Sequence, residues 1–117
     1  MARATLKRAA RVTSKRDFER ARKGGRIVGD SVLRISVLPN GLSATRLGLA
    51  VPRRGSNVER NRIKRIVREV FRLCRERLPG GFDLIVSPRD FMKACDFAAV
   101  SKSFEALAAR LQAGKAP

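Results

Sequence analysis

The spacing of apolar residues along the chain predicts helices in its middle and at its end, and a capping Ser with a Gly-Gly stop predicts another near its start. Capping residues begin the other two helices as well. Ser14 can cap the first helix and Asp96 the last, while Ser56 and Glu59 have the S-x-x-E spacing of a capping box. The expected helices therefore cover residues 15–24, 57–78 and 97–111.

Strand patterns fill the gaps between these helices. Residues 26–41 are rich in β-branched residues and end in the turn signal Pro-Asn-Gly, and residues 45–52 alternate apolar and other side chains. Residues 82–87, "FDLIVS", are almost continuously apolar, as in a strand buried on both faces. The order helix, strands, helix, strand, helix predicts a small α/β (α+β) sandwich with helices packed on a central sheet.

The middle helix has two contrasting faces. Its apolar stripe should face the sheet and consists of Ile63, Ile66, Val67, Val70, Phe71, Cys74 and Leu78. The opposite face is a row without an acid: Lys64, Arg75, Arg68, Asn61, Arg72 and Arg65. A solvated face with salt bridges is the alternative, but stacked like charges cost a few tenths of a kcal/mol per pair. The row therefore favours a polyanionic partner.

The charge of the whole chain favours the same partner. It carries 27 Lys and Arg against 10 Asp and Glu, a formal charge of +17. Nucleic acid is the first candidate and an anionic membrane surface the second. At 117 residues the chain is long enough for a single domain, predicted at residues 11–112. Residues 1–10 are predicted to be a flexible basic arm and residues 113–117 a frayed tail.

Missing residue types argue against catalysis by the protein itself. The chain has no His, its carboxylates are scattered, and its Cys residues lack the spacing of a zinc site. We therefore predict no catalytic residue and no metal ligand, which disfavours a protein-only nuclease. No apolar run could span a bilayer, and the basic opening segment lacks a secretory core. A transit peptide is the alternative there; we expect a cytoplasmic protein.

Charge alone does not distinguish DNA from RNA. A basic helix between strand signals argues against a helix-turn-helix. Arg53 and Arg54 lie close to the expected start of this helix, whose free amides could add an anion site. Among the Phe residues, Phe18 has few apolar neighbours on its helix and could stack on an unpaired base, although a core position is also possible.

The motif "RNRIKR", residues 60–65, with Arg68 one turn later, resembles the signature of the bacterial ribonuclease P protein component. "RVTSKRDF", "RLGLAVPRR" and "FDLIVSPR" resemble the family's flanking segments in the same order, so that the resemblance covers residues 11–111. It implies an αβββαβα fold with a left-handed βαβ crossover. It also implies that a separate RNA subunit cleaves the 5′ leader from precursor tRNA with its own Mg²⁺, and that no small-molecule substrate is involved.

The resemblance also assigns roles to residues. The residues that would bind the RNA subunit are Arg53, Arg54, Arg60, Asn61, Arg62, Lys64, Arg65, Arg68 and Arg72. Phe18, Arg22 and Arg34 would line the cleft that takes the leader; Arg22 and Arg34 stand where the family often has aromatics. Leader binding should therefore depend more on charge. The alternative function is a ribosomal-type RNA-binding protein with no role in cleavage.

Overall fold

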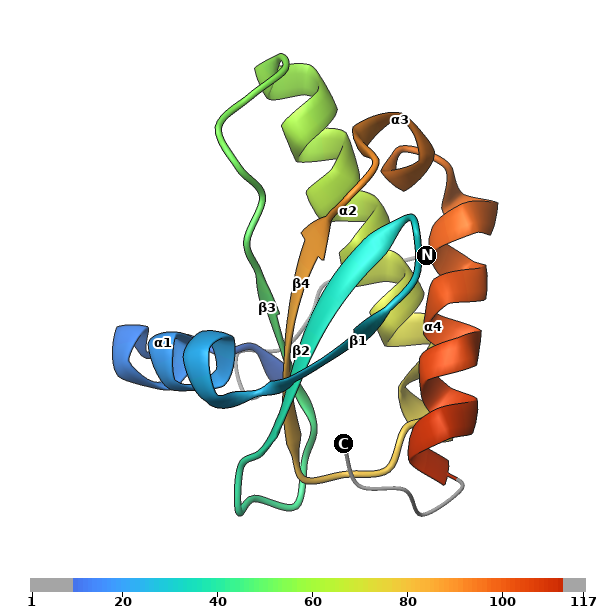
Figure 1. Cartoon of the computed structure of the whole chain (residues 1–117). Helices are drawn as coiled ribbons and strands as arrows, with labels where there is room; N and C mark the ends of the chain where they lie inside the picture. Colours follow the sequence, from blue (N-terminus) through green and yellow to red (C-terminus); the bar gives the residue numbers. More distant parts are fainter. Residues whose placement is uncertain (1–9, 113–117) are drawn as a thin grey trace, which may run out of the picture.

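The computed structural model describes residues 10–112 as one folded unit (Figure 1). Its elements are α1 (Lys15–Gly24), β1 (Arg26–Gly29), β2 (Leu33–Pro39), β3 (Arg46–Leu49), α2 (Asn57–Cys74), the 3-10 turn η2 (Arg75–Arg77), β4 (Phe82–Pro88), α3 (Phe91–Ala94) and α4 (Phe97–Gln112). The predicted arm, apart from Ala10, and the predicted tail lie outside the described residues. Ala10 itself is fully buried in the core.

The strands form one mixed sheet in the order β1-β2-β4-β3. β2 pairs antiparallel with both β1 and β4, whereas β3 and β4 are parallel and are joined through α2. In Figure 1 both of these strands run upward with β4 to the right of β3, and α2 passes behind the sheet. The crossover is therefore left-handed, against the usual right-handed rule and as the family resemblance implies.

The main core lies between the sheet and the layer formed by α2 and α4. β2 and β4 contribute Leu33, Ile35, Leu84 and other alternating side chains, and the rings of Phe71 and Phe104 meet edge to face with centroids 6.4 Å apart. The predicted apolar stripe of α2 is buried or half-buried throughout. It packs along α4 more extensively than along the strands, so the helix pair and the sheet share this core.

Of the helices between residues 10 and 112, α1 is the one on the other face of the sheet, against β2 and β4 (Figure 1). The pairing register places every second residue of these strands on this face, including Arg34, Ser36 and Ile85, and Gly48 of β3 lies opposite Ile85. Within the described residues this face is therefore only partly covered, because one short helix cannot span four strands.

The structure differs from the sequence prediction in three local features. The α-helix of α2 ends at Cys74 and continues as the 3-10 turn to Arg77. A short helix, α3, follows β4; Asp90 caps it by accepting a hydrogen bond from the Lys93 amide. Phe97 fits the apolar period of α4, yet it is 41 % exposed because it begins the helix, beyond the edge of the core.

Candidate nucleic-acid interface

The basic face of α2 begins at a well-formed N-terminus. The Ser56 hydroxyl accepts from the Glu59 amide at 3.1 Å, and the Glu59 carboxylate accepts from the Ser56 amide at 3.1 Å, as the sequence predicts. Each bond satisfies an amide that would otherwise lack a partner. The capping box also puts a carboxylate at this end, which weakens the anion site predicted there from free amides.

Three members of the predicted row, Asn61, Arg65 and Arg68, are exposed along α2, while Lys64 and Arg75 are half-buried. Arg62, on the flank beside the row, is exposed as well. Lys64, Arg65 and Arg68 form no ion pair with any residue between 10 and 112. This face therefore offers several guanidinium and ammonium groups to a polyanion, without an acid of its own to satisfy them first.

Two residues of the predicted set are less available. The Arg72 guanidinium lies 3.0 Å from the carboxylate of Glu69, which stands on the flank beside the row, so part of the charge of Arg72 is neutralised although the row itself contains no acid. Arg60 is half-buried at the border of the apolar stripe and donates to the Asn57 side chain at 2.7 Å. Among the described residues, the Nε of both side chains is buried without a hydrogen-bond partner, and an unsatisfied donor of this kind costs free energy.

The loop between β3 and α2 adds two exposed cations, Arg53 and Arg54. Gly55 follows with φ +72°, a left-handed conformation that a residue with a Cβ adopts only at a cost. This glycine turns the chain into the helix and brings the Arg54 guanidinium 4.7 Å from the centroid of the Phe91 ring, a cation–π contact.

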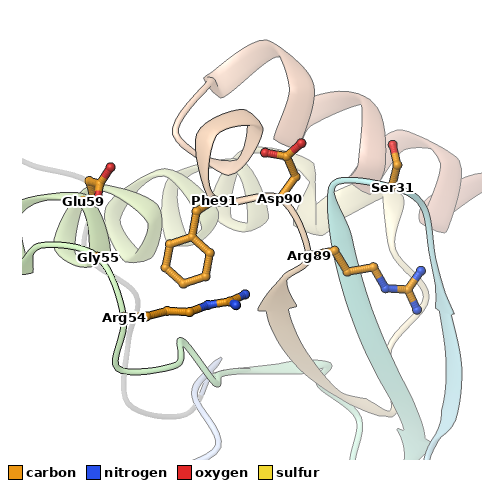
Figure 2. Close-up of a pocket in the computed structure, with 7 residues that line it drawn as sticks. All are labelled: Ser31, Arg54, Gly55, Glu59, Arg89, Asp90 and Phe91. Atoms are coloured by element: carbon orange, nitrogen blue, oxygen red, sulfur yellow. The ribbon is translucent and has the colours of Figure 1, made fainter.

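A shallow pocket of about 520 Å³ opens beside this contact (Figure 2). Arg89 reaches toward the turn between β1 and β2, where it donates to the Asp30 carbonyl at 3.1 Å. The pocket lining mixes both charge signs: Ser31, Arg54, Gly55, Glu59, Arg89, Asp90 and Phe91. Its two guanidinium groups extend the basic surface of α2 around the end of the sheet. Neither Arg89 nor Phe91 is among the site residues predicted from the sequence.

The second predicted group lies around α1 and the partly open face of the sheet. Phe18 is half-buried, and its ring lies directly over Gly48 of β3. A Cβ at position 48 would stand 3.1 Å from that ring and 2.6 Å from the Ile85 side chain, so the glycine makes room for Phe18. Arg34 is half-buried on the same face, opposite Ser87 of β4. Phe18 and Arg34 thus border one surface.

Arg22 is the third predicted residue of this group, one turn after Phe18 on α1. It is exposed, and its guanidinium donates to the Glu19 carboxylate at 3.0 Å. This hydrogen bond and the charge of Arg22 hold the pKa of Glu19 below its usual range. A phosphate would therefore compete with Glu19 for Arg22.

A buried charged network between α1 and the sheet was missed by the sequence analysis. Asp83 of β4 is fully buried and receives two hydrogen bonds from Arg46 of β3, both at 2.8 Å. The same guanidinium contacts Asp17 of α1 at 3.2 Å. One signal was present in the sequence: an Asp inside the apolar strand pattern "FDLIVS" needs a partner when it is buried.

Neither a metal site nor a nucleophile stands out between residues 10 and 112. No three His, Cys, Asp or Glu residues in that range come together to hold a metal ion. Cys74 is buried, and this burial raises the pKa of its thiol, so it packs as a core residue. Within the same range, no helix combines the length and apolarity needed to cross a membrane.

Comparison with known proteins relates the chain as a whole to a family. The model of the family "Ribonuclease P" matches residues 6–112. The ribonuclease P protein component of Thermotoga petrophila is 34% identical over 110 residues, covering 90% of this chain and 94% of that protein. The solved ribonuclease P protein of Thermotoga maritima superposes with a TM-score of 0.77 at 33% identity, covering 86% of this chain and 96% of that one. That of Staphylococcus aureus does so with 0.73 at 29%, covering 93% and 98%.

Proposed function

The chain belongs to the ribonuclease P protein family, and from this premise we propose how its two surfaces serve the enzyme. As a ribonuclease P protein component it is a subunit in the maturation of tRNA 5′ ends and a partner of the ribonuclease P RNA. The ribosomal-type alternative receives no support from the comparisons.

The proposed division of labour assigns the cleavage chemistry to the RNA subunit. The RNA would hold the Mg²⁺ ions and cut the precursor tRNA, while the protein would bind and position the two RNAs. The composition supports this: the chain has no His for acid–base chemistry, and its carboxylates are few. We place the assembled enzyme in the cytoplasm, where tRNA precursors are made in bacteria.

The RNA subunit would lie along α2 and the loop before it. The observation that carries this proposal is the exposure of Asn61, Arg65 and Arg68 along one side of α2, with Arg62 exposed on the flank beside them, in the segment that resembles the family's signature. Guanidinium groups suit the purpose because they form paired hydrogen bonds to phosphate oxygens, and Asn61 can contact a sugar or a base edge. The remaining cations of the proposed RNA-binding surface are Arg53, Arg54, Arg60, Lys64 and Arg72.

The leader of the precursor tRNA would cross the partly open face of the sheet. Phe18 offers a ring on which one unpaired base can stack, while Arg34 and Arg22 offer cations to the backbone. With a single aromatic at these three positions, charge should supply most of the leader affinity. That affinity should therefore fall steeply with salt; a shallow dependence would contradict this assignment.

The experiment that tests the function is cleavage of a precursor tRNA at low Mg²⁺. This protein alone, a bacterial ribonuclease P RNA alone and the two together are compared. We expect efficient cleavage at the mature 5′ end only in the mixture, because the protein raises substrate affinity while the RNA supplies the chemistry. Cleavage by the purified protein alone would contradict the proposed division of labour, and no cleavage by the mixture would contradict the assignment of the subunit.

A further inference from the structure

The charged network on the α1 side of the sheet links three elements that are distant in sequence. Arg46 of β3 donates from Nε to Asp83 Oδ1 and from a terminal nitrogen to Asp83 Oδ2. Asn40, just after β2, donates to the same carboxylate at 2.9 Å and also to the Ala44 carbonyl. The fully buried Asp83 carboxylate accepts all three of these hydrogen bonds. The two bonds from Arg46 hold its guanidinium in one orientation.

The Arg46 guanidinium also makes one contact with α1. Its terminal nitrogen lies 3.2 Å from Asp17 Oδ2, and only 14 % of the Arg46 side chain is exposed. Asp17 stands in the first turn of α1, immediately before Phe18. Because neighbouring helical residues keep a fixed angular relation, holding Asp17 against the sheet also fixes the direction in which Phe18 points.

Helix α1 needs such a contact because its apolar surface is small. In its sequence "KRDFERARKG" only Phe18 and Ala21 are apolar, and Ala21 alone is fully buried. Before the helix, the Val12 amide donates to the Leu47 carbonyl of β3 and ties the chain to the sheet; at its end, the Gly25 amide donates to the Ala21 carbonyl within the last turn. The side chain of Asp17 adds an ion pair between α1 and the sheet.

We propose that Asp17, held by the buried Arg46–Asp83 pair, is a positioning residue that fixes α1 so that Phe18 lies over Gly48 and can receive the leader. This inference rests on the proposed leader-binding face. Asp17 itself contributes a negative charge beside that face, so it acts on the leader through Phe18 and not by binding it.

The test uses Asp17→Asn in the holoenzyme reconstituted with a bacterial ribonuclease P RNA. The affinity for precursor tRNA is compared with that for the same tRNA without its leader. If Asp17 acted only through its charge, removing that charge should strengthen RNA binding. If Asp17 positions Phe18, the same substitution should weaken binding of the leader, so the two explanations predict opposite changes in affinity. We expect the affinity gained from the leader to fall about three- to tenfold, because Asn can still accept a hydrogen bond from Arg46 but without the added strength of a charged acceptor. The affinity for the leaderless RNA should not fall. An undiminished or increased leader contribution would overturn the proposal.

Two further measurements separate positioning from a general loss of stability. Glu105→Gln makes the same change of charge on the exposed side of α4 and should leave the leader contribution unchanged. In the free protein, amide hydrogen exchange in α1 should accelerate in Asp17→Asn, while β2 and β4 stay protected. Unchanged exchange in α1 would contradict a role in holding this helix.

A double-mutant cycle with Phe18→Ala shows whether the effect passes through the ring. If Asp17 acts by placing Phe18, Asp17→Asn should add little to the loss caused by Phe18→Ala. If the losses of leader affinity caused by the two substitutions multiply instead, Asp17 does not act through Phe18 and the proposal is overturned. If Phe18→Ala keeps the full leader contribution, the leader-binding face itself is wrong. If Asp17→Asn keeps the full leader contribution while Phe18→Ala loses it, the leader-binding face is supported and the positioning role of Asp17 is wrong.

Discussion

At the scale of single residues, the lack of a side chain at Gly48 shapes the proposed leader-binding face. Gly48 leaves the space into which Phe18 settles, and its missing Cβ would lie within 3.2 Å of two ring carbons. Contacts this close force neighbouring groups to move. The Ile85 methyl can rotate away, but the ring rests on the position itself, so a larger residue there would lift Phe18 from the sheet.

Gly48→Ala is therefore expected to reduce the leader-dependent part of precursor tRNA affinity while the domain remains folded. Overpacking of this kind costs about 1–3 kcal/mol of stability, which urea unfolding would report. Gly24→Ala is the matched control, because a Cβ there meets nothing within 4 Å. A Gly48→Ala protein with unchanged leader affinity would show that the position of the ring over β3 does not matter for binding.

At the scale of elements, α2 combines a core stripe with a basic face, and the two faces predict opposite effects of mutation. Val67 is fully buried between the sheet and α4, whereas Arg65 is exposed and Lys64 half-buried. Truncating the cations leaves the core intact. Val67→Asp instead puts a charge where it has no partner and should unfold the domain.

Lys64→Ala and Arg65→Ala should each weaken binding of the ribonuclease P RNA while leaving thermal unfolding nearly unchanged. If each removes one phosphate contact, the slope of log affinity against log salt should fall by about 0.7–0.9. Arg110→Ala, an equal loss of charge on the exposed side of α4, should leave both the affinity and the slope nearly unchanged. Equal effects of all three substitutions would show that net charge, and not the face of α2, determines binding.

At the scale of the whole molecule, the net charge of +17 destabilises the folded state of the free protein, because its cations repel one another. Among the described residues, the acids that do form pairs lie mostly in local contacts on one helix, such as Arg22 with Glu19. Repulsion among the remaining cations is therefore relieved by salt or by RNA.

Raising salt from about 50 to about 200 mM should consequently raise the melting temperature of the free protein while lowering its affinity for RNA. Both changes have one cause, since ions screen the repulsion within the protein and also compete for the phosphate contacts. Scanning calorimetry and binding titrations in the same buffers measure the pair. A melting temperature that falls with added chloride would contradict a domain strained by its own charge.

The sequence by itself determined those features that depend on neighbours within a few positions. The Ser56–Glu59 capping box, the Asp96 cap of α4 and the buried stripe of α2 all agree with their patterns, because a helix brings residues three and four apart together. A local pattern does not show where a helix ends relative to the core. The apolar period of α4 therefore did not reveal that Phe97, its first residue, lies outside the core.

Tertiary structure alone decided the contacts that join distant segments. Arg46 and Asp83 are 37 positions apart, and nothing local to either one identifies the other. The seating of Phe18 on Gly48 and the pocket beside Arg54 and Phe91 likewise arise only when α1, β3 and α3 assemble around the sheet. Local hydrogen bonds and apolar periods thus set the elements and their charged faces. The placement of those faces follows from strand register and long-range packing, which one position in a sequence does not encode.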